Sequence, residues 1–132
     1  MNRFRISTPE GTRDLLFSSC RALRQTENAV RDALEERGYS EIITPAVEYF
    51  DVFAQANPEL DLPVRLYYSQ KVFRSVSGDH GHKGEFLQVG AEFIGADGLE
   101  ADKDILTAAF AALSKTGADN FRVELGHAEI YK

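Results

Sequence analysis

A glycine-rich loop between two extended runs constrains the fold of this chain more than any other feature. The segment covers residues 72–95 and reads VFRSVSGDHGHKGEFLQVGAEFIG. Val72 and Phe73 close a run of β-branched and aromatic residues, and an extended pattern resumes over residues 85–94. The glycines between the two runs supply turn chemistry. The segment therefore predicts an antiparallel hairpin of residues 64–75 and 85–94, with Arg74 at the mouth of its loop.

Two amphipathic helices flank this hairpin in the sequence. Apolar residues recur at steps of three, four or seven over residues 16–34 and predict a helix there. Ser18 or Ser19 is expected to cap its start, and Gly38 to end it. Cys20 lies on the apolar stripe and is expected in the core or at an interface. A second helix is predicted from Ala101 until Gly117.

Three shorter elements are also predicted. Residues 41–44 read as a short strand that Pro45 ends, because proline has no N–H to give to a ladder. A short helix or turn is expected over residues 49–56. Apolar residues alternate with charged ones over residues 121–125, which predicts a final strand with one solvated face.

This order of elements favours an α+β fold in one domain, residues 1–132. An antiparallel or mixed sheet backed by helices fits it, whereas a doubly wound sheet does not, since strand-helix-strand alternations are few. Neither a G-x-G-x-x-G nor a G-x-x-x-x-G-K-[ST] loop is present. The length of 132 residues and the 43% apolar residues are typical of one globular domain.

Composition excludes several classes of function. The net charge of −6 disfavours broad binding of nucleic acid, which needs clustered Lys and Arg. A single cysteine allows neither an intramolecular disulfide nor a cysteine cage for a metal. No apolar run approaches the length of a bilayer span, and the N-terminus lacks the apolar centre of a signal peptide. A cytoplasmic protein without a membrane segment is expected.

The hairpin carries the candidate site. The planar guanidinium of Arg74 suits a phosphate or carboxylate, although a strand-end arginine paired with a surface acid is the alternative. Gln88, Gly90 and Glu92 alternate on one face, which places an amide and a carboxylate about 7 Å apart beside a glycine gap. Such a pair suits a small amine or an imidazole; the alternative is a merely solvated polar face. No metal site or catalytic triad is predicted.

Four segments together carry a resemblance to a known family. They are residues 9–14 (PEGTRD), 38–48 (GYSEIITPAVE), 74–95 with E-F-x-Q-x-G-x-E at 85–92, and 117–127. This set resembles the class II aminoacyl-tRNA synthetases, in the histidyl branch. The resemblance implies a class II catalytic-core fold, with motif 1 at about residues 16–48 and motif 2 at about 64–95. It also implies a homodimer through the motif 1 region.

Motif 2 holds ATP and the amino acid in that family. The resemblance gives Arg74 the place of the arginine that meets the α-phosphate, and Phe86 that of the aromatic that stacks on adenine. Gln88 and Glu92 match the residues that hold the amino group and imidazole of histidine. The chain thus retains the amino-acid side of the motif.

The nucleotide side departs from the family pattern. Val76 stands where a glutamate for adenine is expected, and His82 and Gly84 replace two arginines of the loop. The chain also lacks the Arg-Pro-Asp or Arg-Pro-Glu hairpin and motif 3, so it resembles an internally shortened core. No catalytic residue is therefore assigned.

A motif 2 with its amino-acid side retained and its nucleotide side altered resembles that of a family of synthetase paralogues, the regulatory subunits of ATP phosphoribosyltransferase. That resemblance implies histidine as a ligand, a short-form catalytic subunit as a possible partner and no cofactor. Two alternatives stay open. One is a minimal histidyl-tRNA synthetase core, for which ATP and Mg²⁺ would be needed, and the other is a dimerisation scaffold without a ligand.

Overall fold

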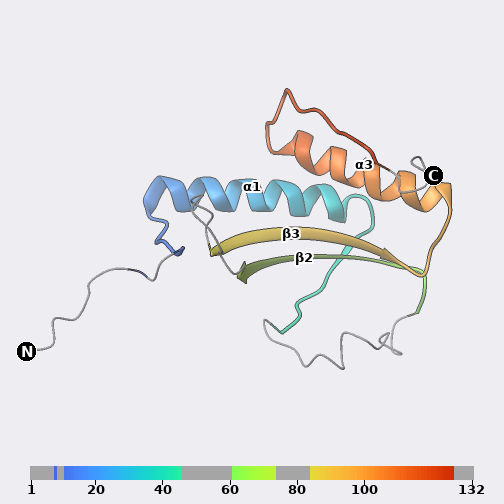
Figure 1. Cartoon of the computed structure of the whole chain (residues 1–132), viewed down its shortest axis with the longest axis horizontal. Coiled ribbons are helices and arrows are strands. Elements are labelled where there is room, and N and C mark those ends of the chain that lie inside the picture. Colours follow the sequence, from blue (N-terminus) through green and yellow to red (C-terminus); the bar gives the residue numbers. More distant parts are fainter. Residues whose placement is uncertain (1–7, 9–10, 46–60, 74–83, 127–132) are drawn as a thin grey trace, which may run out of the picture.

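The structure, a computed structural model, describes residues 8, 11–45, 61–73 and 84–126. It consists of a three-stranded sheet with two helices packed on one of its faces (Figure 1). The elements follow in the order α1 (Phe17–Glu35), β1 (Ser40–Glu41), β2 (Val64–Phe73), β3 (Glu85–Ile94) and α3 (Leu99–Lys115). None of the described helices is long and apolar enough to cross a membrane.

The predicted hairpin is confirmed. β2 and β3 pair in antiparallel register over ten residues each, from Val64 opposite Ile94 to Phe73 opposite Glu85. β1 joins the other edge of β2 in parallel, so the sheet is mixed, with the order β1-β2-β3. β1 is shorter than the predicted strand at 41–44, but the N–H of Ile42 still donates to the carbonyl of Tyr67 at 2.8 Å.

The first helix ends as its sequence predicts. Gly38 has a φ of +79°, which L side chains rarely adopt. The N–H of Gly38 donates to the carbonyl of Glu35, and the N–H of Tyr39 donates to that of Leu34. This pair of bonds is the Schellman arrangement. It turns the chain so that Tyr39 and Leu34, 2% and 3% exposed, enter the same core cluster.

The antiparallel pairing sorts the side chains of β2 and β3 into two faces. Odd-numbered residues of both strands face the helices: Tyr67 is fully buried, and Val89 and Ala91 pack on the same cluster. α3 contributes Ala108, also fully buried, and Ile105. The even-numbered residues form the opposite face, which no described helix covers (Figure 1).

Carboxylates from the helices tie them to β2. The carboxylate of Asp104 accepts hydrogen bonds from Arg65 Nε at 2.9 Å, Arg65 Nη2 at 3.2 Å and the hydroxyl of Tyr39 at 2.8 Å. Burial and the bond to Asp104 raise the pKa of Tyr39 to about 12. Arg65 also lies 4.0 Å from the ring centroid of Phe93. One carboxylate thus joins α3, β2 and the turn after α1.

Several sequence predictions were wrong in detail. α1 starts after Leu16 without a side-chain cap, so neither Ser18 nor Ser19 has the predicted role. Cys20 is exposed, so its predicted place in the core is wrong, and its place at an interface stays a prediction. Residues 121–125 form no strand and are exposed, because no described strand edge pairs with them; Phe121 instead contacts the ring of Phe110 at 5.9 Å between centroids. The predicted helix at 49–56 lies outside the described residues.

The Asp104 cluster predicts an acid-dependent loss of stability. Hydrogen bonds from Arg65 outweigh burial and hold the pKa of Asp104 below its ordinary value of 3.8. Because the pKa of Asp104 is lower in the folded than in the unfolded chain, the carboxylate stabilises the fold fully at pH values above its unfolded-state pKa. This stabilisation is lost as the pH falls through the folded-state pKa. We expect Asp104→Asn to lower the free energy of unfolding near neutral pH by about 1 kcal/mol, since the carboxylate is partly screened by solvent.

Urea unfolding at a series of pH values from neutral to acid measures this difference. The difference between Asp104→Asn and the unaltered chain should shrink as the solution is acidified. Asp102→Asn, an exposed carboxylate on the same helix, is the matched control. Equal losses in the two variants, or a difference that does not change with pH, would contradict the prediction.

Candidate functional site

The candidate site is the sheet face that the helices leave uncovered, here called the open face. Hairpin register assigns to it the even-numbered residues of β2 and β3. They are Val64, Leu66, Tyr68, Gln70 and Val72 from β2, and Phe86, Gln88, Gly90, Glu92 and Ile94 from β3.

Charge is distributed unequally between the two faces of the hairpin. Both strands are fully described, and Glu92 is the one charged side chain on the open face. Glu92 is exposed, and no described residue forms an ion pair with it. Arg65, Lys71 and Glu85 all lie on the helix face, where each has an ionic partner. The open face therefore offers a negative charge to a ligand.

An aromatic side chain crosses the open face from strand to strand. Tyr68 lies opposite Gly90 in the register, and a Cβ added to Gly90 would come within 2.4 Å of the phenol end of Tyr68. The amide Nε2 of Gln88 donates a hydrogen bond to the Tyr68 hydroxyl oxygen at 2.7 Å. Gly90 is thus a glycine because the tyrosine occupies the space above its backbone.

The chain after β1 reaches the edge of the same face. The amide Nε2 of Gln70 donates to the hydroxyl of Thr44 at 3.1 Å. Gln70 and Gln88 are direct cross-strand partners, so two amides lie side by side between Thr44 and Tyr68. The open face therefore combines neutral amides and hydroxyls with the single carboxylate of Glu92.

The structure brings together part of the predicted site. Gln88 and Glu92 share the open face, as predicted, but their Cα atoms are about 13 Å apart at the rise of a β-strand. The predicted separation of about 7 Å is wrong, because that distance separates each of these residues from Gly90. Phe86 is half-buried at the far end of β3, opposite Val72. Arg74 lies outside the described residues.

Tyr68 is the site residue that sequence reasoning missed. A signal was available, because a tyrosine and a glycine face each other once the ten-residue strands are aligned on the loop. Choosing that register from the sequence required knowing at which residue each strand ends, which the local pattern does not give.

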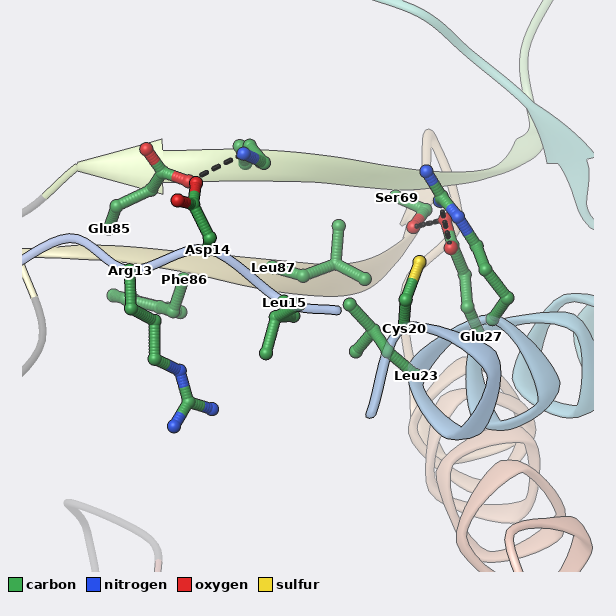
Figure 2. A pocket seen from close by; sticks show the side chains of 12 residues that line it. Arg13, Asp14, Leu15, Cys20, Leu23, Glu27, Ser69, Glu85, Phe86 and Leu87 are labelled. Carbon is green, nitrogen blue, oxygen red and sulfur yellow. Dashed lines mark hydrogen bonds and ion pairs between the residues drawn. The ribbon is translucent and has the colours of Figure 1, made fainter. Parts of the chain in front are cut away.

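The opposite face carries a cleft that the sequence did not predict (Figure 2). Its volume is about 650 Å³, and it lies between residues 13–15, the first turns of α1 and the ends of β2 and β3. Glu27, 6% exposed, accepts hydrogen bonds from Ser69 Oγ at 2.6 Å and Arg24 Nη1 at 2.5 Å. Burial raises the pKa of Glu27, but these bonds outweigh it and hold the pKa below its usual value.

Part of the charged lining of this cleft is paired within the chain. Besides the Glu27 bonds, Lys71 Nζ lies 2.6 Å from Glu85 Oε1. No described group of three histidine, cysteine or acidic side chains is placed to hold a metal ion. A smaller cavity of about 180 Å³ between the helices and β3 is lined by apolar side chains such as Val30, Ile105 and Ala109. Both cavities are therefore secondary to the open face as candidate sites.

Solved structures with the same fold define the class of this chain. A protein from Bacillus halodurans, described as an ATP phosphoribosyltransferase regulatory subunit/histidyl-tRNA synthetase, superposes with a TM-score of 0.72 at 24% identity, over 88% of this chain and 39% of its own. The apo histidyl-tRNA synthetase of S. aureus gives 0.66 at 25% identity, over 83% and 34%. The fold is that of the class II aminoacyl-tRNA synthetases.

Sequence comparison identifies the family within that class. Residues 54–132, more than half of the chain, match the histidyl-tRNA synthetase family, and the chain belongs to this family. Two similar relatives are both called ATP phosphoribosyltransferase regulatory subunit: one from Ruminiclostridium cellulolyticum at 29% identity over 169 residues, and one from Bacillus cereus strain G9842 at 30% over 167.

The relatives are longer than this chain. Each alignment covers all of the chain but 40% of the relative. The alignments extend over 167–169 residues, whereas the chain has 132, so each relative carries residues that have no counterpart inside it. This agrees with the predicted internal shortening of the core.

The fit between Tyr68 and Gly90 predicts an asymmetric response to alanine. Gly90→Ala should force the phenol of Tyr68 aside and break its bond to Gln88, with a loss of about 1–3 kcal/mol in the free energy of unfolding. Gly126→Ala is the matched control, because a Cβ there meets nothing within 4 Å. We expect it to stay within about 0.5 kcal/mol. Urea unfolding of both variants measures the difference, and equal losses would contradict this assignment.

Proposed function

We propose that this chain is a regulatory-subunit-like module of ATP phosphoribosyltransferase that binds histidine on its open face and carries out no chemistry itself. The observation that supports it most directly is that the carboxylate of Glu92 and the amide of Gln88 share an otherwise neutral face. The relatives named as regulatory subunits support the same choice.

The chemistry of the face suits histidine. Its imidazole is a donor that becomes a cation near neutral pH, and a carboxylate is its natural partner. Its ammonium group needs an uncharged or anionic acceptor, such as the carbonyl oxygen of an amide. Gln88 and Glu92, two strand repeats apart, can be reached together only by a ligand with donors at both ends. Histidine has that form.

Adenylation would require more than this face offers. Phosphate groups in a transition state need positioned cations, and no arginine or lysine of β2 or β3 points to the open face. The sequence also has Val76 and Gly84 where the family carries residues for the nucleotide. These two observations support a ligand-binding role without catalysis, and without ATP or Mg²⁺ as cofactors.

Two kinds of protein partner belong to the proposal. A homodimer through the motif 1 region would cover Leu16, Phe17 and Ile43, which are 60%, 88% and 83% exposed in the single chain. Burial of such side chains is favourable in a subunit interface. The second partner is a short-form catalytic subunit of ATP phosphoribosyltransferase, as the names of the relatives suggest. Nucleic acid has no part in the proposal, and the cytoplasm is its proposed location.

A minimal histidyl-tRNA synthetase core is the second candidate, favoured by the family match over residues 54–132. Under that alternative ATP and Mg²⁺ would be required, with Arg74 on the α-phosphate and Phe86 on adenine. Histidine-dependent exchange of pyrophosphate into ATP separates the two. We expect no exchange above background; turnover that Arg74→Ala abolishes would favour the enzyme.

Calorimetric titration tests the proposed ligand. The chain should bind histidine and show weak or no heat with ATP. Glu92→Gln should weaken histidine binding about tenfold or more, because it removes a charge-assisted hydrogen bond. Glu100→Gln is the control, since Glu100 is an exposed carboxylate on α3, away from the open face. The absence of histidine binding would favour a scaffold without a ligand, and equal weakening by both variants would contradict a site at Glu92.

A further inference from the structure

The hydrogen bond between Tyr68 and Gln88 bears on which way the amide of Gln88 points. The Tyr68 hydroxyl oxygen accepts the Nε2–H of Gln88 at 2.7 Å. An amide whose nitrogen is held in this way has its carbonyl oxygen on the other side of its plane. No described donor reaches the Oε1 oxygen of Gln88. Within the part of the chain that the structure describes, the Oε1 atom of Gln88 is therefore an acceptor without a donor on the open face.

The position of Tyr68 is itself fixed by its neighbours. Three atoms at the phenol end of Tyr68 would lie 2.4–2.6 Å from a Cβ on residue 90, so the ring end is seated in the notch that the missing side chain leaves. Tyr68 and Gly90 are direct partners in the register, which the ladder of ten residue pairs holds. The tyrosine cannot sit there in any chain with a larger residue at position 90.

We propose that Tyr68 is a positioning residue that aims the carbonyl oxygen of Gln88 and thereby makes the open face selective for ligands with a protonated amine. The inference rests on the proposed histidine site and names the group by which that site selects its ligand. Without the tyrosine, the amide can rotate and present its NH₂ group, which repels an ammonium. Gln88 touches the ligand, and Tyr68 acts through Gln88.

The test compares histidine with its deaminated analogue, imidazolepropionate, by calorimetry on the full chain. The unaltered chain should prefer histidine, because the free acceptor pairs with the ammonium. Tyr68→Phe keeps the ring over Gly90 but removes the hydroxyl, and we expect it to reduce this preference about tenfold. Binding of imidazolepropionate itself should change little.

Tyr67→Phe is the matched control. Tyr67 is the adjacent residue, and its hydroxyl donates to Glu35 Oε1 at 2.6 Å on the helix side of the sheet. The same atom is removed from the same kind of residue, one position away and on the opposite face. This variant should keep the full preference for histidine, even where its stability falls.

A second measurement does not depend on any ligand. In the ¹H–¹⁵N spectrum, the side-chain NH₂ signals of Gln88, assigned by their loss in Gln88→Glu, should shift in Tyr68→Phe and stay in place in Tyr67→Phe. Unchanged signals in Tyr68→Phe would overturn the positioning role. If the signals shift but the unaltered chain binds no histidine, the proposed function fails and the selectivity for amines fails with it. If histidine binds and Tyr68→Phe retains the full preference, the proposed function stands and Tyr68 has no positioning role.

Discussion

The register between β2 and β3 is the constraint on which the rest of the structure depends. It sends two adjacent tyrosines to opposite faces: Tyr67 is fully buried under the helices, whereas Tyr68 lies across the open face on Gly90. A slip of one residue would exchange the two faces of a strand. It would remove Ser69 and Arg65 from the helix carboxylates and Tyr68 from its glycine. The core and the candidate site are therefore fixed by the same set of backbone pairs.

Much of this fold is readable from the sequence, for identifiable reasons. The hairpin and both helices follow from strong periodicity, and the end of α1 follows from a glycine that takes a positive φ. Residues 121–125 have the alternation of a strand, but a strand forms only where its backbone can hydrogen-bond to the edge of a sheet, and no described edge pairs with them. Gln88 and Glu92 were placed on one face correctly, since alternation is local. The role of Tyr68 depends on cross-strand register, which local patterns do not contain.

The two faces of the sheet differ in how their polar groups are satisfied. On the helix side, the carboxylates of Glu27, Glu35 and Asp104 each accept a hydrogen bond from a hydroxyl group of the sheet or of the turn before it. Glu27 is the buried one of the three, and its bonds offset the cost of removing a carboxylate from water. On the open side, Gln88 donates to Tyr68, and no described residue donates to the Oε1 atom of Gln88. Stability is thus concentrated on one face, and the other can be adapted to a ligand without disturbing the core.

The charge on the open face is likewise not used to hold the described part of the fold together. Lys71 and Arg65 each neutralise an acid on the helix side, so the described sheet has no spare cation to offer Glu92. A carboxylate without an ionic partner in the described residues is free to pair with a cation that arrives from outside. Glu92 is thus both a matched motif 2 residue and the charge that has no ionic partner among the described residues. This is the basis on which a positively charged donor is proposed as the ligand of the open face, and the match to the histidyl-tRNA synthetase family is the basis for proposing histidine.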